Sequence, residues 1–151
     1  MPTAEAAVRG ADLICTVTTS DQPVLLGEWL SPGAHINAVG AYRPWTRELD
    51  TAAVVRSRMY VDRLEAALSE AGDFLIPRSE GAVSDDHIVG EIGQVLAGDL
   101  SGRRSPEDIT LFKSLGIAIE DLAAAHHILR KAEATGRGIW VEMGGRHFGS
   151  S

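Results

Sequence analysis

The sequence predicts an α/β fold, in which a mostly parallel sheet with flanking helices is followed by a long carboxyl-terminal helix. Three observations lead to this prediction. Short apolar runs of strand length end at glycine or at polar residues. Segments with helical apolar spacing lie between and after these runs, and most connections are short. Strands that alternate with helices across short connections form parallel sheets with helices on their faces.

Two apolar runs predict the first two buried strands. Residues 11–17 form a compact apolar run that starts after Gly10 and ends at a polar segment. Residues 34–39 follow the turn pair Pro32-Gly33 and stop at the next glycine. Each run is therefore expected to be a strand of the sheet, with a loop at its carboxyl end.

Residues 59–61 predict a third strand, and a helix over residues 63–71 follows it directly. Asp62 and Glu65 have the spacing of a capping box at the start of this helix. Gly72 is expected to end it, because glycine is the preferred residue just after a helix.

A further helix and a last strand are predicted in the middle of the chain. Four apolar residues recur at helical spacing before Gly98, namely Ile88, Ile92, Val95 and Leu96. They predict a helix over this segment. Residues 109–112 are a short apolar run that predicts the last strand.

The longest amphipathic stretch follows Ser114 and ends at Gly136. It repeats an apolar residue at steps of four and three, at Ala118, Leu122, Ala125, Leu129 and Ala132. Acidic residues lie near its start and basic residues near its end, which complements the helix macrodipole. Residues 1–136 are therefore expected to form one domain, and residues 137–151 a tail of uncertain order.

Composition excludes several classes of function. The net charge is −7 and the basic residues are scattered, which argues against a nucleic-acid partner. No apolar run is long enough to cross a membrane, and the first residues lack the pattern of a signal peptide. Cys15 is the only cysteine, which indicates a reducing, cytoplasmic location. Its position in an apolar strand favours a small core residue over a reactive thiol.

No metal site or hydrolytic triad is predicted. His126 and His127 are adjacent on the long helix, so they point about 100° apart and cannot face one metal ion together. The acidic run at residues 85–87 has the pattern of a helix start rather than of a metal site. No Ser/His/Asp arrangement is supported by the predicted elements.

Ligand contacts are expected at the carboxyl ends of the first two strands, where open α/β sheets bind their ligands. Thr16, Thr18 and Thr19 lie at one strand end, and residues 40–44 lie at the next. The alternative for these hydroxyl groups is that they only cap turns. No Gly-x-Gly-x-x-Gly turn is present, because the glycine-rich residues 144–149 follow no predicted strand.

Several ordered motifs closely resemble the ornithine cyclodeaminase / mu-crystallin family, over roughly residues 4–135. They occupy residues 23–30, 32–41, 43–44, 47–50, 60–62, 91–93, 112–116 and 120–121. The resemblance implies a partial Rossmann-like sheet, in which residues 1–136 are the carboxyl-terminal half of an NAD(P)-binding domain. NAD or NADP is the implied cofactor.

The resemblance also implies which residues contact the cofactor. The loop Thr16-Val17-Thr18 and the loop that contains Val39, Gly40 and Ala41 are expected to border the nicotinamide half of NAD(P). Leu115, in the motif Phe-Lys-Ser-Leu-Gly, is expected beside the same ring.

The implied chemistry is hydride transfer between amino acids and imines. Members of the family act as cyclodeaminases, alanine dehydrogenases or ketimine reductases, so an amino acid or a cyclic imine is the expected substrate. Tyr42 occupies the position of the catalytic aspartate of the cyclodeaminases. A phenol is a much weaker base than a carboxylate at neutral pH, which disfavours ornithine cyclisation.

The family's glycine turn and its substrate-binding Lys and Arg match no part of this sequence and would precede it. The expectation is therefore a truncated chain that is inactive alone and that needs a missing amino-terminal half or a homo-oligomer. The alternative functions are a noncatalytic module that binds small molecules or another protein, and a folded remnant without a function. An exposed sheet edge would favour pairing with a further chain.

Overall fold

The computed structural model describes residues 3–141. The chain divides after Gly116 into two compact units, Met1–Gly116 and Ile117–Ser151. The first unit contains the sheet and the second contains the long helix. The predicted domain of residues 1–136 and the predicted tail after it stay predictions. Residues 142–151 of that tail lie outside the described residues.

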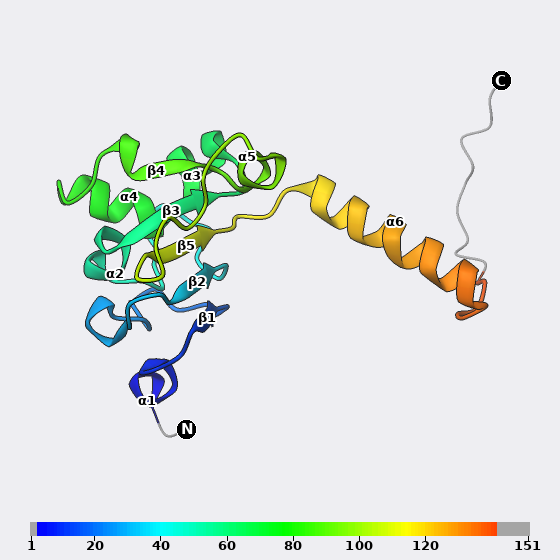
Figure 1. Ribbon diagram of the computed structural model, residues 1–151, viewed down its shortest axis with the longest axis horizontal. Coiled ribbons are helices and arrows are strands. Elements are labelled where there is room, and N and C mark those ends of the chain that lie inside the picture. The colour runs from blue at the N-terminus through cyan, green and yellow to red at the C-terminus, as the bar shows by residue number, and fades with distance from the viewer. Residues whose placement is uncertain (1–2, 142–151) are drawn as a thin grey trace. The chain divides into compact units, whose positions relative to one another are not determined.

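The sheet of the first unit has five parallel strands in the order β1-β2-β5-β3-β4 (Figure 1). This confirms the predicted α/β class and its parallel sheet. The strands are β1 (Leu13–Thr16), β2 (His35–Ala38), β3 (Ser57–Val61), β4 (Ile88–Glu91) and β5 (Ile109–Lys113). Within residues 3–141, β5 is the last strand along the chain, and it lies in the middle of the sheet.

One row of apolar side chains crosses the whole sheet and forms the centre of the core. The strand register aligns Ile14, Ile36, Leu111, Met59 and Ile88, and all five are buried. Three helices cover this face with buried residues of their own: α2 (Thr51–Val55), α3 (Leu64–Glu70) and α4 (Gly72–Ser79).

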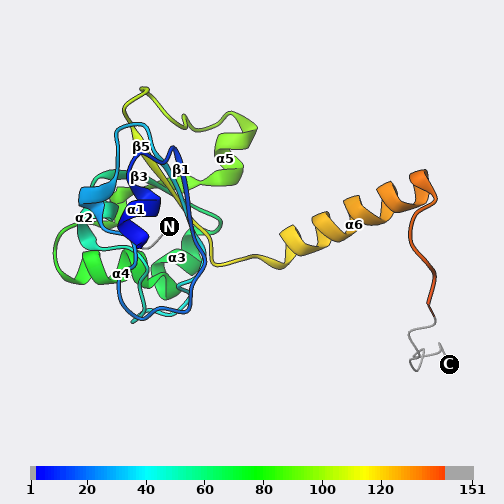
Figure 2. The same cartoon turned by 90° about the horizontal axis from the view of Figure 1, so that it is seen from below.

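The other face of the sheet is covered only in part. Helix α5 (Ile92–Ala97) contacts β4 and lies on the opposite side of the sheet from α2 and α4 (Figure 2). Cys15 points to this face from β1, at the far edge of the sheet, and is exposed. The prediction of Cys15 as a core residue is therefore wrong, because no helix of the described residues packs over its end of the sheet.

Residues 88–91 form strand β4 and not the first turn of the predicted helix. The helix begins only at Ile92, and a capping box between Glu91 and Gln94 marks its start. Ile88 pairs with Met59 of β3 and is buried, so pairing in the sheet outweighs the helical spacing that predicted otherwise. The helix from Ile92 to Ala97 confirms the remainder of that prediction.

Helix α3 confirms the predicted helix, but both of its predicted end signals have other roles. Asp62 is not its cap: the residue before the helix is Arg63, which makes no side-chain cap hydrogen bond. Gly72 ends no helix and instead begins α4, which the sequence did not predict. A Cβ on Gly72 would lie 2.0 Å from the carbonyl oxygen of Thr46, so glycine is needed there for close packing.

The second unit contains α6 (Ala118–Thr135), which confirms the predicted long helix and ends at Gly136 in the left-handed conformation. None of its residues is buried, and Leu122 and Leu129 of the apolar face are exposed. Among residues 3–141, no helix is long and apolar enough to cross a membrane. The remaining short elements are α1 (Ala4–Val8) and the 3-10 turns Gly27–Trp29 and Asp85–His87.

Candidate functional site at the carboxyl edge of the sheet

Three loops meet where the parallel strands end. The register aligns Thr16 of β1 with Ala38 of β2, Lys113 of β5 and Val61 of β3. The loops that follow β1, β2 and β5 therefore start at one edge of the sheet. This is the edge at which the sequence predicted ligand contacts.

Glu48 joins the loop after β1 to the loop after β2. One carboxylate oxygen accepts a hydrogen bond from the Thr18 N–H at 2.6 Å, and the other accepts one from the Gly40 N–H at 2.8 Å. Burial alone would raise the pKa of Glu48, but the hydrogen bonds from the two loops outweigh it and hold the pKa below its ordinary value. The fully buried, ionised Glu48 thus fixes both loops.

Gly40 allows these two loops to approach each other. A Cβ at this position would lie 2.2 Å from the Thr18 carbonyl oxygen and 2.5 Å from the Glu48 carboxylate. No side chain fits at such distances. Glycine at this position is therefore a requirement of the site's geometry, and not only of a turn.

A buried ion pair lies beneath the second loop. Asp73 of α4 and Lys113 of β5 are both fully buried and lie 3.2 Å apart. Asp73 also accepts hydrogen bonds from the N–H groups of Glu48 and Leu49, at 2.8 and 3.0 Å. Burial raises the pKa of Asp73, while the Lys113 ammonium and the two N–H groups act in the opposite direction.

Asp62 holds the third loop, which follows β5. Its carboxylate accepts hydrogen bonds from the Leu115 N–H at 2.6 Å, the Gly116 N–H at 2.7 Å and the Ser114 hydroxyl at 3.2 Å. Its other oxygen accepts one from the Arg63 N–H. Asp62 is buried at the end of β3, so the strand fixes its position and Asp62 fixes that of the loop.

The residues predicted to contact a cofactor lie in these loops but differ in exposure. Val17 and Val39 are 68% and 41% exposed, and Leu115 is half-buried against the core. Thr16 and Ala41 are buried. The structure brings all of the predicted residues to one edge of the sheet.

A small polar hollow opens beside this edge. Its volume is about 180 Å³, and it is lined by Thr19, Ser20, Asp21, Gly40, Tyr42, Arg43 and Thr46. Tyr42 is 55% exposed. The Arg43 guanidinium lies 5.2 Å from the centre of the Tyr42 ring and forms no ion pair within residues 3–141. The hollow can therefore present a phenol and a free guanidinium to a small anionic molecule.

Sequence reasoning did not predict the residues that hold the loops. Glu48 and Lys113 lie in the recognised motifs without a predicted role, Asp62 was predicted only as a helix cap, and no sequence signal pointed to Asp73. An acidic or basic residue at the boundary of an apolar run was the signal available for Asp62 and Lys113. No group of His, Cys, Asp and Glu in the described part of the chain could hold a metal ion.

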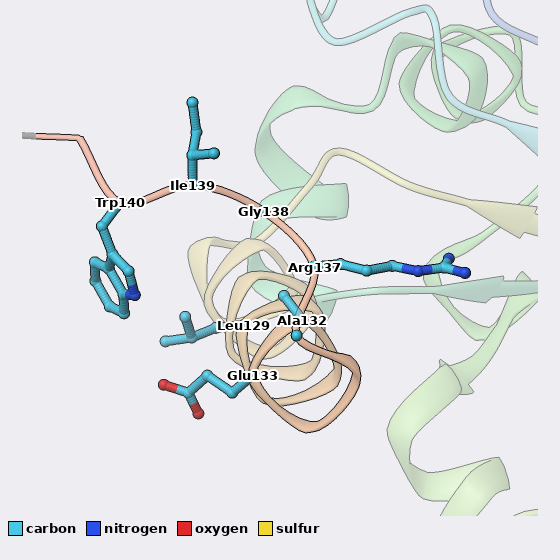
Figure 3. A pocket seen from close by; sticks show the side chains of 8 residues that line it. Leu129, Ala132, Glu133, Arg137, Gly138, Ile139 and Trp140 are labelled. Atoms are coloured by element: carbon cyan, nitrogen blue, oxygen red, sulfur yellow. The ribbon is translucent and has the colours of Figure 1, made fainter.

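The second unit contains a larger hollow, of about 600 Å³, where the chain turns back after α6 (Figure 3). Leu129, Glu133 and Trp140 border it, and Arg137 extends away from Trp140. Trp140 is 87% exposed. Within the described residues, polar groups do not converge on this hollow, and we propose no ligand for it.

A parallel α/β sheet with loops fixed at its carboxyl edge is the architecture of Rossmann-like domains, which bind their ligands at that edge. The model of the ornithine cyclodeaminase/mu-crystallin family matches residues 2–136. The chain therefore belongs to this family, as the motifs predicted.

Three relatives illustrate the similarity. Ketimine reductase mu-crystallin of Mus musculus is 49% identical over 121 residues, which are 80% of this chain and 36% of the mouse protein. Delta(1)-pyrroline-2-carboxylate reductase of Colwellia psychrerythraea is 43% identical over 126 residues, 83% of this chain and 40% of that protein. The solved structure of the Thermococcus litoralis Delta(1)-pyrroline-2-carboxylate reductase, in complex with NADH and L-proline, superposes with a TM-score of 0.84 at 40% identity.

The chain covers less than half the length of each of these proteins. It spans 36% of the mouse protein, 40% of the Colwellia protein and 44% of the Thermococcus chain, whereas that last match covers 93% of the present chain. The cofactor class expected from the motifs, NAD or NADP, agrees with the NADH of the Thermococcus complex.

Proposed function

We propose that this chain forms the nicotinamide side of an NAD(P)-dependent site that reduces cyclic imines bearing a carboxylate. The observation that carries the proposal is the set of three loops at the carboxyl edge, which Glu48 and Asp62 hold by backbone hydrogen bonds. Such pre-organisation is what a site needs in order to orient a planar ring against a substrate. Two of the relatives are named as reductases of pyrroline-2-carboxylate, which is such an imine.

The exposed residues at this edge fit the nicotinamide half of the cofactor. Val17 and Val39 offer apolar surface beside the strand ends, and the half-buried Leu115 adds to it from the third loop. An apolar wall accommodates the face of a nicotinamide ring and excludes water from it. When bound, NAD(P)H supplies the hydride for the imine carbon. The chain's own loops orient the ring for that transfer.

We place the substrate in the polar hollow next to Tyr42 and Arg43. The phenol of Tyr42 can donate a hydrogen bond to the imine or amine nitrogen, and the unpaired Arg43 guanidinium can attract a carboxylate. A phenol at this position favours reduction over deaminating cyclisation, because it is a poor base at neutral pH. The relatives' reductase names support this choice, and they do not favour the noncatalytic alternative.

Catalysis requires groups that these 151 residues do not supply. The sequence has no glycine turn for the pyrophosphate and no counterpart of the family's substrate-binding Lys and Arg. We therefore propose that activity depends on a further polypeptide segment that provides them. We also propose that the protein is a homo-oligomer and is located in the cytoplasm.

A chimaera tests this function. The matching segment of the Thermococcus litoralis reductase is replaced by residues 3–135 of this chain, and reduction of pyrroline-2-carboxylate by NADH is followed. We expect turnover. A folded chimaera that binds NADH but leaves the imine unchanged would contradict the proposed substrate, and one that binds no NADH would contradict the whole proposal.

Two valine variants test the cofactor contact. Val17→Asp places a charge on the proposed ring-binding surface, whereas Val55→Asp places one at an exposed position at the end of α2. We expect the first to weaken NADH binding by the chimaera at least about tenfold and the second to leave it unchanged, since only the first removes apolar contact. Equal affinities would remove Val17 from the site.

A further inference from the structure

Lys113 is a fully buried lysine with three acceptors around its ammonium group. Its Nζ donates to the Ala38 carbonyl oxygen at 3.2 Å and to the Ala41 carbonyl oxygen, and it lies 3.2 Å from the Asp73 carboxylate. The proposed chemistry uses neither Lys113 nor Asp73. Neither residue can contact a ligand, because both side chains have no exposed surface.

A buried ion pair of this kind contributes little to net stability. Removing two charges from water costs roughly as much as their attraction returns, and apolar residues of similar volume often serve as well. Unlike a simple core contact, this pair forms hydrogen bonds with the backbone next to the loops of the site. Lys113 is bonded to the backbone that leads into the loop after β2, and Asp73 is bonded to the Glu48 N–H.

The connections continue from the ion pair to the surface of the site. Asp73 holds the backbone of Glu48, and the Glu48 carboxylate holds the N–H groups of Thr18 and Gly40. Lys113 holds the carbonyl group of Ala41, the residue between Gly40 and Tyr42. Both loops are thus tied to one buried pair by a short series of hydrogen bonds.

We infer that Asp73 and Lys113 are positioning residues, which set the loop that carries Gly40 and Tyr42 relative to the loop that carries Thr18. The inference concerns the loops themselves; it rests on the proposed function only for what the loops bind. It predicts that the pair can be neutralised with little change in global stability, while the two loops lose their fixed arrangement.

The test compares amide hydrogen exchange in the 151-residue chain and in its double variant Asp73→Asn/Lys113→Met. This variant removes both charges together, so that no unpaired charge is left in the core. We expect the amides of Thr18 and Gly40 to exchange at least about tenfold faster, because methionine frees the Ala41 carbonyl group and asparagine holds the Glu48 N–H less strongly than a carboxylate does. The amides of Met59 to Val61 in β3 should keep their rates. The control variant Asp86→Asn/Lys131→Met makes the same changes at exposed positions.

Two results would overturn the inference. Equal acceleration in the loops and in β3 would mean that the pair only stabilises the fold, and unchanged loop exchange would mean that it positions nothing. If the double variant does not fold, Lys113→Met alone serves the same comparison, since it frees the Ala41 carbonyl group and leaves an Asp73 carboxyl whose pKa burial already raises, so that this group can become neutral. Because no cofactor is present in this experiment, failure of the proposed function would not affect its outcome.

Discussion

Gly40 and Thr18 lie so close that a Cβ on Gly40 would meet the Thr18 carbonyl oxygen at 2.2 Å. This contact joins the loops that follow two neighbouring strands, and the Glu48 carboxylate bonds to both of them. The site is therefore built from backbone that is packed as tightly as a protein core.

Gly40→Ala is expected to destabilise the chain by about 1–3 kcal/mol, because the loops must move apart to admit the methyl group. Urea denaturation measures the loss. Gly93→Ala is the matched control: Gly93 lies within α5, with nothing within 4 Å of an added Cβ. That variant should be as stable as the wild type or about 0.5–1 kcal/mol more stable. Equal stability of the two variants would show that the loops are not tightly packed.

Glu48→Gln is expected to lower the free energy of unfolding at pH 7 by about 2–4 kcal/mol, since an uncharged amide replaces a carboxylate that accepts two N–H groups. The folded-state pKa of Glu48 is below its ordinary value of 4.5. Its ionised form thus stabilises the fold above that pH, and this contribution disappears as the pH falls through the folded-state pKa.

The difference between wild type and Glu48→Gln should therefore shrink below about pH 4.5. Denaturation curves at a series of pH values measure it. Glu28→Gln, at an exposed position, should show almost no difference at any pH. A constant gap between wild type and Glu48→Gln down to low pH would argue against ionised Glu48 in the folded chain.

Asp62→Asn should loosen the loop after β5 and cost about 2–3 kcal/mol, because one carboxylate serves three donors of that loop. Hydrogen exchange at Leu115 and Gly116 measures the local effect. The exposed Asp86→Asn provides the control. Protection of both amides at the wild-type level in Asp62→Asn would contradict the role given to Asp62.

Tyr42→Phe should leave stability within about 0.5 kcal/mol, because the ring is exposed and its hydroxyl bonds to no residue in the described part of the chain. In the chimaera we expect kcat to fall about 10- to 100-fold if the phenol assists the imine. Tyr60→Phe should lower stability and leave kcat unchanged, because the Tyr60 hydroxyl shares its hydrogen bond between the Ser101 and Gly102 carbonyl groups, away from the site. An unchanged kcat in Tyr42→Phe would exclude a role for its hydroxyl.

Cys15 should react with a thiol reagent in the folded chain about as fast as in the unfolded chain, because it is exposed on β1. Mass spectrometry after brief treatment with iodoacetamide measures the extent of reaction, with and without urea. Strong protection in the folded chain would mean that another surface covers this face of the sheet in solution.

The sequence predicted the sheet well because buried parallel strands are apolar runs with clear ends, as in the strands that contain Ile14, Ile36 and Leu111. Ile88 was assigned to a helix because a short apolar segment fits both periods, and only pairing with β3 decides between them. Gly72 has the sequence position of a helix end, but the reason for glycine there is its close packing against the Thr46 carbonyl oxygen.

The candidate site was predictable only in outline. Strand ends are visible in a sequence, so the loops that contain Thr18 and Gly40 could be identified. The residues that hold them could not, because Glu48, Asp73 and Lys113 come from three separate elements and meet only in the folded chain. Most charged residues are solvated, and nothing in the sequence around Glu48 or Asp73 marks them as buried exceptions.

The position of β5 has a consequence for synthesis of the chain on the ribosome. β5 joins β2 to β3, yet it is made after the other four strands of this sheet. Until residues 109–113 have emerged, the β1-β2 and β3-β4 pairs have no strand between them, and their inner edges stay open. The sheet therefore closes late in translation, and a ribosome that pauses before Ile109 will hold a nascent chain that chaperones can recognise.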